Sequence, residues 1–166
     1  DIAILGDSHA EHYFIGMAEE LTKSNVVYYS RDGIPTINED IYADVFKYVI
    51  NESNIKTVII SFNIPLRIAR SPKGLDGITS DLIETIGALI SEGKQVYLID
   101  GVPEFSFHPK YCKYDSPLLH KHQCDQDRKL FDKKYVEYEP LIKRVLNSNP
   151  EIRLIQPSLI LCKNSV

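Results

Sequence analysis

The tetrapeptide Gly6-Asp7-Ser8-His9 combines the residue types in this chain that are best suited to chemistry. It follows the apolar run 2–5 and precedes a segment with apolar residues at helical spacing, so it predicts a turn between a buried strand and a helix. A serine in such a turn stands at the helix N-terminus, where free amides and the helix dipole stabilise developing negative charge. Ser8 is therefore a candidate nucleophile for a reaction that passes through an oxyanion. A plain N-cap role for Asp7 or Ser8 explains the same pattern, and the sequence alone leaves both open.

The rest of the chain supplies the alternating strands and helices that would position this turn. Strands are expected over residues 2–5, 26–29, 57–62, 95–99 and 151–155. Helices are expected over 10–22, 40–51, 78–92 and 127–147, the last bent or interrupted by Pro140, and loops over 63–77 and 100–125. Five strands joined through helices need crossover connections, which predicts one doubly wound α/β domain with a five-stranded parallel sheet. The ligand site of such a sheet lies at the carboxyl ends of its strands, where Ser8 is placed.

Composition limits the kind of protein that carries this turn. The chain has 166 residues, of which 43% are hydrophobic and 25% charged, with a formal net charge of −4, as expected for one folded domain rather than a disordered segment. No basic stripe indicates a nucleic-acid surface, and no glycine-rich phosphate-binding motif indicates a nucleotide, so we expect neither nucleic acid nor a cofactor. The longest uncharged apolar run, Thr57–Leu66, is shorter than the roughly 20 residues that cross a bilayer, so we expect no membrane span.

Leu5-Gly6-Asp7-Ser8-His9, at the end of the first expected strand, resembles the opening block of the SGNH (GDSL-like) hydrolase superfamily. With the helix that follows, it is similar more narrowly to the SGNH domains fused to acyltransferase-three membrane proteins, which O-acetylate cell-envelope and surface polysaccharides. The resemblance implies a flavodoxin-like fold of the SGNH-hydrolase type and covers nearly the whole chain. It extends to Gly101-Val102-Pro103-Glu104, Pro109, Cys112, Gln156-Pro157 and Leu161-Cys162.

The resemblance assigns roles to one residue after each of the first three strands. It implies that Ser8 is the acyl nucleophile and that its backbone amide donates to the oxyanion. It implies that the amide of Gly33 and the side chain of Asn63 are the other two oxyanion donors. From the residues alone, Gly33 also fits a turn that needs a positive φ angle, and Asn63 fits a turn before Pro65. Both alternatives stay open.

The resemblance also implies an imidazole base and its carboxylate partner, which these domains carry in an Asp-x-x-His motif near the C-terminus. No Asp-x-x-His follows Cys162, so we expect residues 1–166 to be a single SGNH-like domain excised from a longer membrane protein, without its C-terminal catalytic segment. His9 is too close to Ser8 in the chain for an in-line approach and is expected to face substrate or to be structural. The spacing assigns none of the other histidines to Ser8; they are His12, His108, His120 and His122.

The chain has three cysteines, an odd number. Cys112 and Cys124, with His120 and His122, offer thiolate and imidazole ligands for zinc, but their spacing fits no standard zinc finger or ribbon. We favour a Cys112–Cys124 disulfide that holds the long loop, and no metal, as fits a domain outside the cytoplasm. Cys162 would then pair with a cysteine beyond this chain, or carry a free buried thiol.

Together these expectations describe an extracytoplasmic domain of a polysaccharide O-acyltransferase that acts through an acyl-serine. A membrane acyltransferase domain would supply the acyl donor, and a glycan would be the acceptor. His9, Phe105 and Phe107 are the expected substrate-binding residues, the two rings as sugar-stacking surfaces. The protein would work on the periplasmic or extracellular face, tethered to the cytoplasmic membrane. The alternatives are a carbohydrate or lipid O-acyl esterase, in which water is the acceptor, and a non-catalytic SGNH-fold binding domain.

Overall fold

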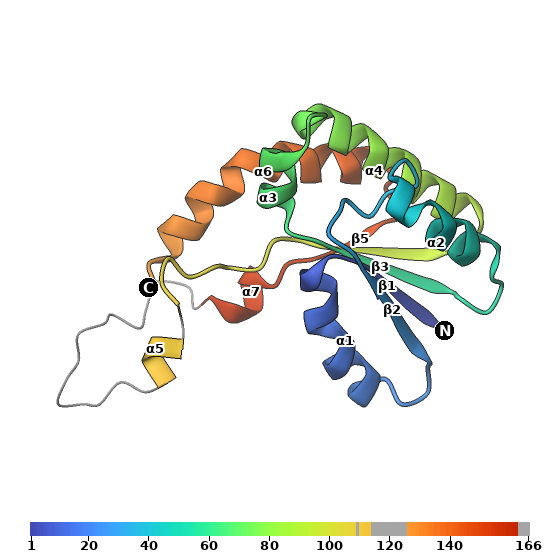
Figure 1. Ribbon diagram of the computed structural model, residues 1–166, viewed down its shortest axis with the longest axis horizontal. Coiled ribbons are helices and arrows are strands. Elements are labelled where there is room, and N and C mark those ends of the chain that lie inside the picture. The colour runs from blue at the N-terminus through green and yellow to red at the C-terminus, as the bar shows by residue number, and fades with distance from the viewer. Residues whose placement is uncertain (109, 114–125, 163–166) are drawn as a thin grey trace.

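The chain folds around a five-stranded parallel sheet with helices on both faces (Figure 1). The computed structural model describes residues 1–108, 110–113 and 126–162. Within these residues the strands are β1 (Ile2–Gly6), β2 (Val26–Ser30), β3 (Thr57–Ser61), β4 (Gln95–Ile99) and β5 (Arg153–Ile155). The helices are α1 (Ser8–Glu20), α2 (Asp40–Asn51), α3 (Ile64–Arg70), α4 (Gly74–Ser91), α5 (Lys110–Lys113), α6 (Arg128–Ser148) and α7 (Ser158–Leu161).

The strands lie in the order β2-β1-β3-β4-β5, and every neighbouring pair is parallel. This arrangement confirms the predicted doubly wound α/β fold. The chain reverses its direction of travel across the sheet between β1 and β3, which makes this pair the switch point. Gly6 lies opposite both Ser30 and Ser61 in the register, and Ser61 lies opposite Ile99. The loops that follow β1, β2, β3 and β4 therefore leave the same end of the sheet.

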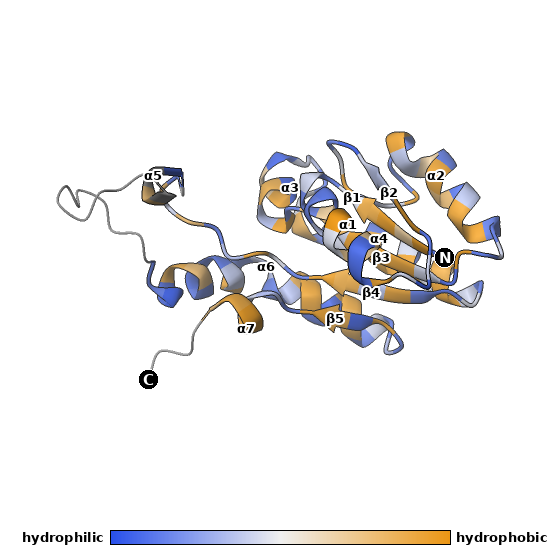
Figure 2. Cartoon of the chain, turned by 90° about the horizontal axis from the view of Figure 1, so that it is seen from below, coloured by the Kyte–Doolittle hydropathy of each residue, from blue (hydrophilic) through white to orange (hydrophobic). Residues whose placement is uncertain are grey.

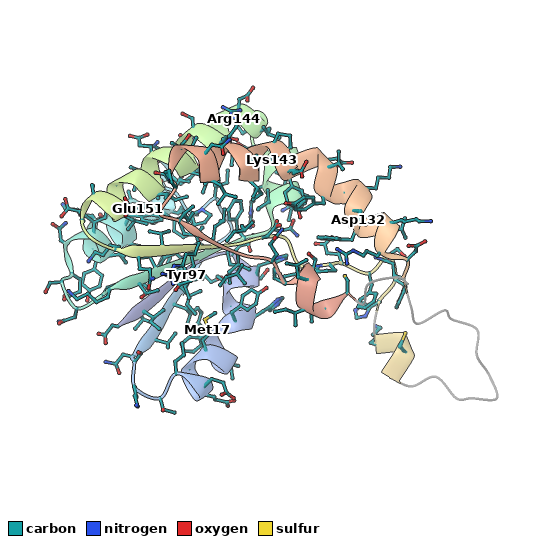
Figure 3. The ribbon with its side chains drawn as sticks, turned by 180° about the vertical axis from the view of Figure 1, so that it is seen from behind. Met17, Tyr97, Asp132, Lys143, Arg144 and Glu151 are labelled. Atoms are coloured by element: carbon teal, nitrogen blue, oxygen red, sulfur yellow. The ribbon has the colours of Figure 1, made fainter. Side chains whose placement is uncertain are left out.

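Alternate residues along each central strand point to opposite faces of the sheet, and both faces are apolar (Figure 2). One face packs in the large core beneath α2, α4 and α6. Its strand residues are Ala3, Leu5, Val58, Ile60, Val96 and Leu98. The other face packs against α1 and includes Ile4, Ile59 and Ile99, with Met17 and Tyr97 beside them (Figure 3). Because the central strands are covered on both faces, they are aliphatic along most of their length.

The segment after β3 differs from its expected structure. The prediction of a loop over 63–77 is wrong, because α3 and the first turn of α4 lie there. Asn63 is the N-cap of α3, and its Oδ1 accepts a hydrogen bond from the amide of Leu66 at 3.0 Å. Pro65 occupies the first turn, where a helix does not need its missing N–H. Pro140 also lies inside α6 without interrupting it.

Among the described residues, no helix combines the length and the apolar character that crossing a bilayer requires.

Candidate active site

The turn after β1 presents Ser8 to solvent at the start of α1. Asp7 is the N-cap of this helix, and its carboxylate accepts a hydrogen bond from the amide of His9 at 3.0 Å. The capping role therefore belongs to Asp7, which leaves the Ser8 hydroxyl free of that task. Gly6 allows the turn to pass close to β3, since a Cβ atom there would lie 1.7 Å from the backbone oxygen of Ser61. No larger residue fits at this position of the backbone.

The buried carboxylate of Asp7 joins the loop after β1 to the loop after β3. While its Oδ1 accepts from His9, its Oδ2 accepts from the amide of Asn63 at 3.1 Å. The same Oδ2 also accepts from Arg67 Nε at 3.1 Å and from Arg67 Nη2 at 2.9 Å. A buried charge is tolerated only when it is paired and hydrogen-bonded, and Asp7 has both kinds of partner. The position of Ser8 is thereby fixed relative to Asn63.

Arg67, in α3, extends this connection to the loop after β2. The residue is buried, and its Nη1 forms an ion pair with the exposed carboxylate of Asp32 at 2.5 Å. The hydrogen bond from Arg67 holds the pKa of Asp32 below its ordinary value. A hollow of about 340 Å³ lies beside Ser8; it is lined by Asp7, Ser8, Ser30, Arg31, Asp32 and Arg67. The sequence alone did not single out Arg67. Asn63 followed by Pro65 is a pattern typical of a helix start, and it could have indicated the helix α3 that carries Arg67.

Gly33 directly follows Asp32, which lines this hollow, but Gly33 itself does not line it. Its amide donates a hydrogen bond to the carbonyl oxygen of Arg31 at 2.9 Å. A Cβ atom at Gly33 would lie 2.5 Å from Cδ1 of Ile41, the flexible end of a partly exposed side chain, so a small shift of Ile41 would make room for a larger residue. Gly33 is not among the glycines with a positive φ angle, so the predicted turn of that kind is wrong, and the oxyanion role of its amide stays a prediction.

Tyr42, in α2, holds the carboxyl ends of β1 and β2 together from the face of the sheet that α2 covers. Its hydroxyl donates a hydrogen bond to the carbonyl of Gly6 and accepts one from the amide of Arg31 at 3.3 Å. The Arg31 amide also donates to the Gly6 carbonyl, at 3.0 Å. Burial raises the pKa of the Tyr42 hydroxyl well above its ordinary value, so this group stays protonated. These hydrogen bonds hold the backbone at Gly6, two residues before Ser8, in addition to the bonds that Asp7 makes.

The side-chain amide of Asn63 has two partners at this site. Its Nδ2 donates to Oε1 of Glu104 at 3.0 Å and lies 3.3 Å from Nε2 of His9. Because an amide nitrogen can only donate, Nε2 of His9 must be the acceptor in this pair, which makes His9 neutral. Burial lowers the pKa of His9, whereas the negative charge of Asp7 raises it. The ring of His12, stacked on that of His9 with 5.9 Å between the centroids, also lowers the pKa of His9. His9 thus faces Asn63.

A cavity of about 290 Å³ opens on the other side of Asn63, between α6 and the segment that follows β4. His9, Asn63 and Glu104 line it, and Lys134 and Glu137 line it from α6. Apolar residues complete it, among them Pro65, Val102, Leu130 and Phe131. Phe105 and Phe107 do not line it; their ring centroids lie 5.0 Å apart, and Phe105 is exposed. Their predicted role as sugar-stacking surfaces stays a prediction.

Asp100 anchors the segment that carries Glu104 at the end of β4. It is buried, and its Oδ1 accepts a hydrogen bond from the amide of Gly101 at 2.6 Å. Burial raises the pKa of Asp100, although Tyr135, Tyr138 and other polar side chains nearby favour its charged form. In turn, burial and the negative charge of Asp100 raise the pKa of Tyr135 to about 12. The sequence indicated only that a loop begins here.

The predicted cysteine pairing falls partly outside the described residues. Cys124, His120 and His122 lie in the range that is not described, so the Cys112–Cys124 disulfide stays a prediction. Cys162 has a free thiol in this structure. Within 1–108, 110–113 and 126–162, no three His, Cys, Asp or Glu side chains lie together in a way that would hold a metal ion.

The parallel α/β sheet places the Ser8 turn beside its switch point, where ligands of such sheets bind. The family model described as "SGNH domain (fused to AT3 domains)" matches residues 1–166, the whole of the chain. The chain therefore belongs to this family of SGNH domains, which occur fused to acyltransferase-three (AT3) domains, and the predicted resemblance is confirmed. No curated protein matches the chain. The family match supports an activity of the esterase or acyltransferase kind.

Proposed function

We propose that this chain is the extracytoplasmic domain of a polysaccharide O-acyltransferase and that Ser8 forms the acyl-enzyme intermediate of the transfer. The observation that supports this most strongly is the anchoring of the Ser8 turn. Asp7 takes the capping role and fixes Asn63 through the same carboxylate, while Ser8 faces an open hollow. This is what a nucleophile in a preorganised site requires.

The first half-reaction forms an acyl-serine. The oxygen of Ser8 attacks the carbonyl carbon of the acyl donor, a C–O bond forms, and the donor's leaving group departs with the electrons of the broken bond. The Ser8 proton passes to an imidazole, which in this family comes from the Asp-x-x-His motif. The Ser8 amide at the N-terminus of α1 and the Asn63 side chain are the groups that would stabilise the oxyanion, together with the amide of Gly33 once it leaves Arg31.

The second half-reaction passes the acyl group to a sugar. A glycan hydroxyl loses its proton to the same base, its oxygen attacks the acyl carbon, and the Ser8 oxygen leaves and recovers a proton. The domain would belong to a longer membrane protein whose acyltransferase-three part delivers the acyl donor to the periplasmic or extracellular face. An esterase would use the same site with water as the acceptor.

Labelling with a fluorophosphonate probe, which reacts with activated serines, tests this proposal. We expect labelling of the full-length protein, which would supply the Asp-x-x-His base, none of its Ser8→Ala variant, and unchanged labelling of its Ser30→Ala variant. Ser30 is the matched control because it lines the same hollow at the end of the neighbouring strand. Equal labelling of wild type and Ser8→Ala would contradict the proposal.

A further inference from the structure

The Asn63 side chain is fully engaged in the structure, although the proposed function needs it as an oxyanion donor. A primary amide has two N–H bonds. The Nδ2 atom of Asn63 has two acceptors in reach, Oε1 of Glu104 at 3.0 Å and Nε2 of His9 at 3.3 Å. One of these two contacts must therefore break before Asn63 can donate to an oxyanion at Ser8.

Glu104 is the partner that can leave. His9 belongs to α1, is half-buried, and has its backbone amide held by Asp7. Glu104 lies in an irregular segment, and its side chain is 46% exposed. Its other carboxylate oxygen lies 3.4 Å from Nζ of Lys134, an exposed ion pair of the kind that contributes little stability. A ligand that offers Glu104 a better hydrogen bond would therefore draw it away from Asn63.

The cavity beside Glu104 has the chemistry to hold such a ligand. Two carboxylates, Glu104 and Glu137, and two ammonium groups, Lys133 and Lys134, line it, so its charges balance. Donors and acceptors surround an apolar patch that includes Phe131, and the volume of about 290 Å³ is large enough for a small ring. This combination suits a neutral polyhydroxyl ring better than an anion or a cation.

We propose that Glu104 couples binding of a neutral saccharide in this cavity to release of the Asn63 amide. A sugar hydroxyl donates to the Glu104 carboxylate in place of Asn63, and Asn63 then turns an N–H toward the acyl group on Ser8. Water does not fill the cavity as a sugar does, so the site favours transfer over hydrolysis. This inference rests on the proposed function, because it assumes that Ser8 and Asn63 act together.

The rate at which 4-nitrophenyl acetate acetylates Ser8 in the full-length protein, followed by intact mass, tests the coupling. Glu104→Ala frees Asn63, so we expect acetylation several-fold faster than in wild type. Glu104→Gln keeps an acceptor oxygen for Asn63, so it should be acetylated more slowly than Glu104→Ala. Asp132→Ala is the matched control, because Asp132 is an exposed acidic residue of α6 that does not line the cavity. The gain from Glu104→Ala should disappear in an Asn63→Ala background.

The possible outcomes separate the two proposals. If Ser8 is not acetylated in a full-length protein that carries the Asp-x-x-His motif, the proposed function fails. If wild type is acetylated but Glu104→Ala is no faster, or is equally accelerated with Asn63→Ala present, the coupling by Glu104 is wrong.

The ligand class has its own measurement on the wild-type chain. Methyl α-D-glucopyranoside should shift the Asn63 side-chain amide signals in NMR spectra in the direction that Glu104→Ala shifts them. A shift with the anionic methyl α-D-glucuronide alone, or with neither sugar, would overturn the assignment of a neutral saccharide.

Discussion

Replacing Asp7 with asparagine tests whether one buried carboxylate holds the active-site loops together. The new side chain is nearly the same size, but its amide offers one oxygen where the carboxylate of Asp7 has two. If that oxygen faces Arg67 and the amide of Asn63, the amide of His9 loses its N-cap. If it faces His9 instead, an NH₂ group meets three donors. Neither orientation satisfies the site.

The expected loss of stability follows from these contacts. The side chains of Asp7 and Arg67 are only 4% and 8% exposed, so solvent screens their interaction little. Removing one partner of a buried ion pair costs about 3–5 kcal/mol; the lower end applies because Arg67 keeps Asp32. Loss of an N-cap adds about 1 kcal/mol. The sum, about 4 kcal/mol, corresponds to a fall in Tm of about 8–16 °C for a domain of this size.

Thermal unfolding followed by circular dichroism measures this effect, with Asp32→Asn as the control. Asp32 also pairs with Arg67, but its side chain is 81% exposed, so its replacement should change Tm much less. Equal Tm values for Asp7→Asn and Asp32→Asn would refute the reasoning that the buried carboxylate is the anchor.

Two further predictions concern the neighbours of the Ser8 turn. Tyr42→Phe removes the hydroxyl that bonds Gly6 and Arg31 and should lower the free energy of unfolding by about 1–3 kcal/mol. In urea unfolding this appears as a lower midpoint with an unchanged m value. An unchanged midpoint would contradict the prediction. His9 has a pKa below its ordinary value of 6.5, so the unfolded chain takes up a proton first as the pH falls, and stability decreases below about pH 6.5. His9→Gln should lose less Tm than wild type between about pH 7.5 and about pH 5, and an equal loss in both proteins would show that other groups cause it.

Local patterns were sufficient to predict the sheet and the serine turn. Val58, Ile59 and Ile60 are aliphatic because β3 is buried on both faces, and the glycine before Asp7 is required by the close approach to Ser61. The parallel arrangement of the strands followed from the alternation of strands and helices. These features depend on residues that are neighbours in the sequence, and such features are the ones a single sequence reveals.

The contacts that define the site depend on residues far apart in the sequence. Arg67 pairs with Asp7 across 60 positions, and Asn63 bonds Glu104 across 41. No periodicity connects such residues, so neither pairing was predicted. Arg67 was further hidden because proline and glycine after β3 indicated a loop, whereas Pro65 starts a helix capped by Asn63. The engagement of the Gly33 and Asn63 amides was likewise visible only in three dimensions.

The most direct test of the central claim is to locate the acyl group itself. The full-length protein, with the Asp-x-x-His motif that the mechanism requires, is incubated with 4-nitrophenyl acetate, quenched in acid, digested and mapped by mass spectrometry. We predict one acetyl group on the Ser8 hydroxyl, lost on brief treatment with hydroxylamine and absent in Ser8→Ala. Acetylation confined to lysine side chains, or to any serine other than Ser8, would contradict the role of Ser8 as the acyl carrier.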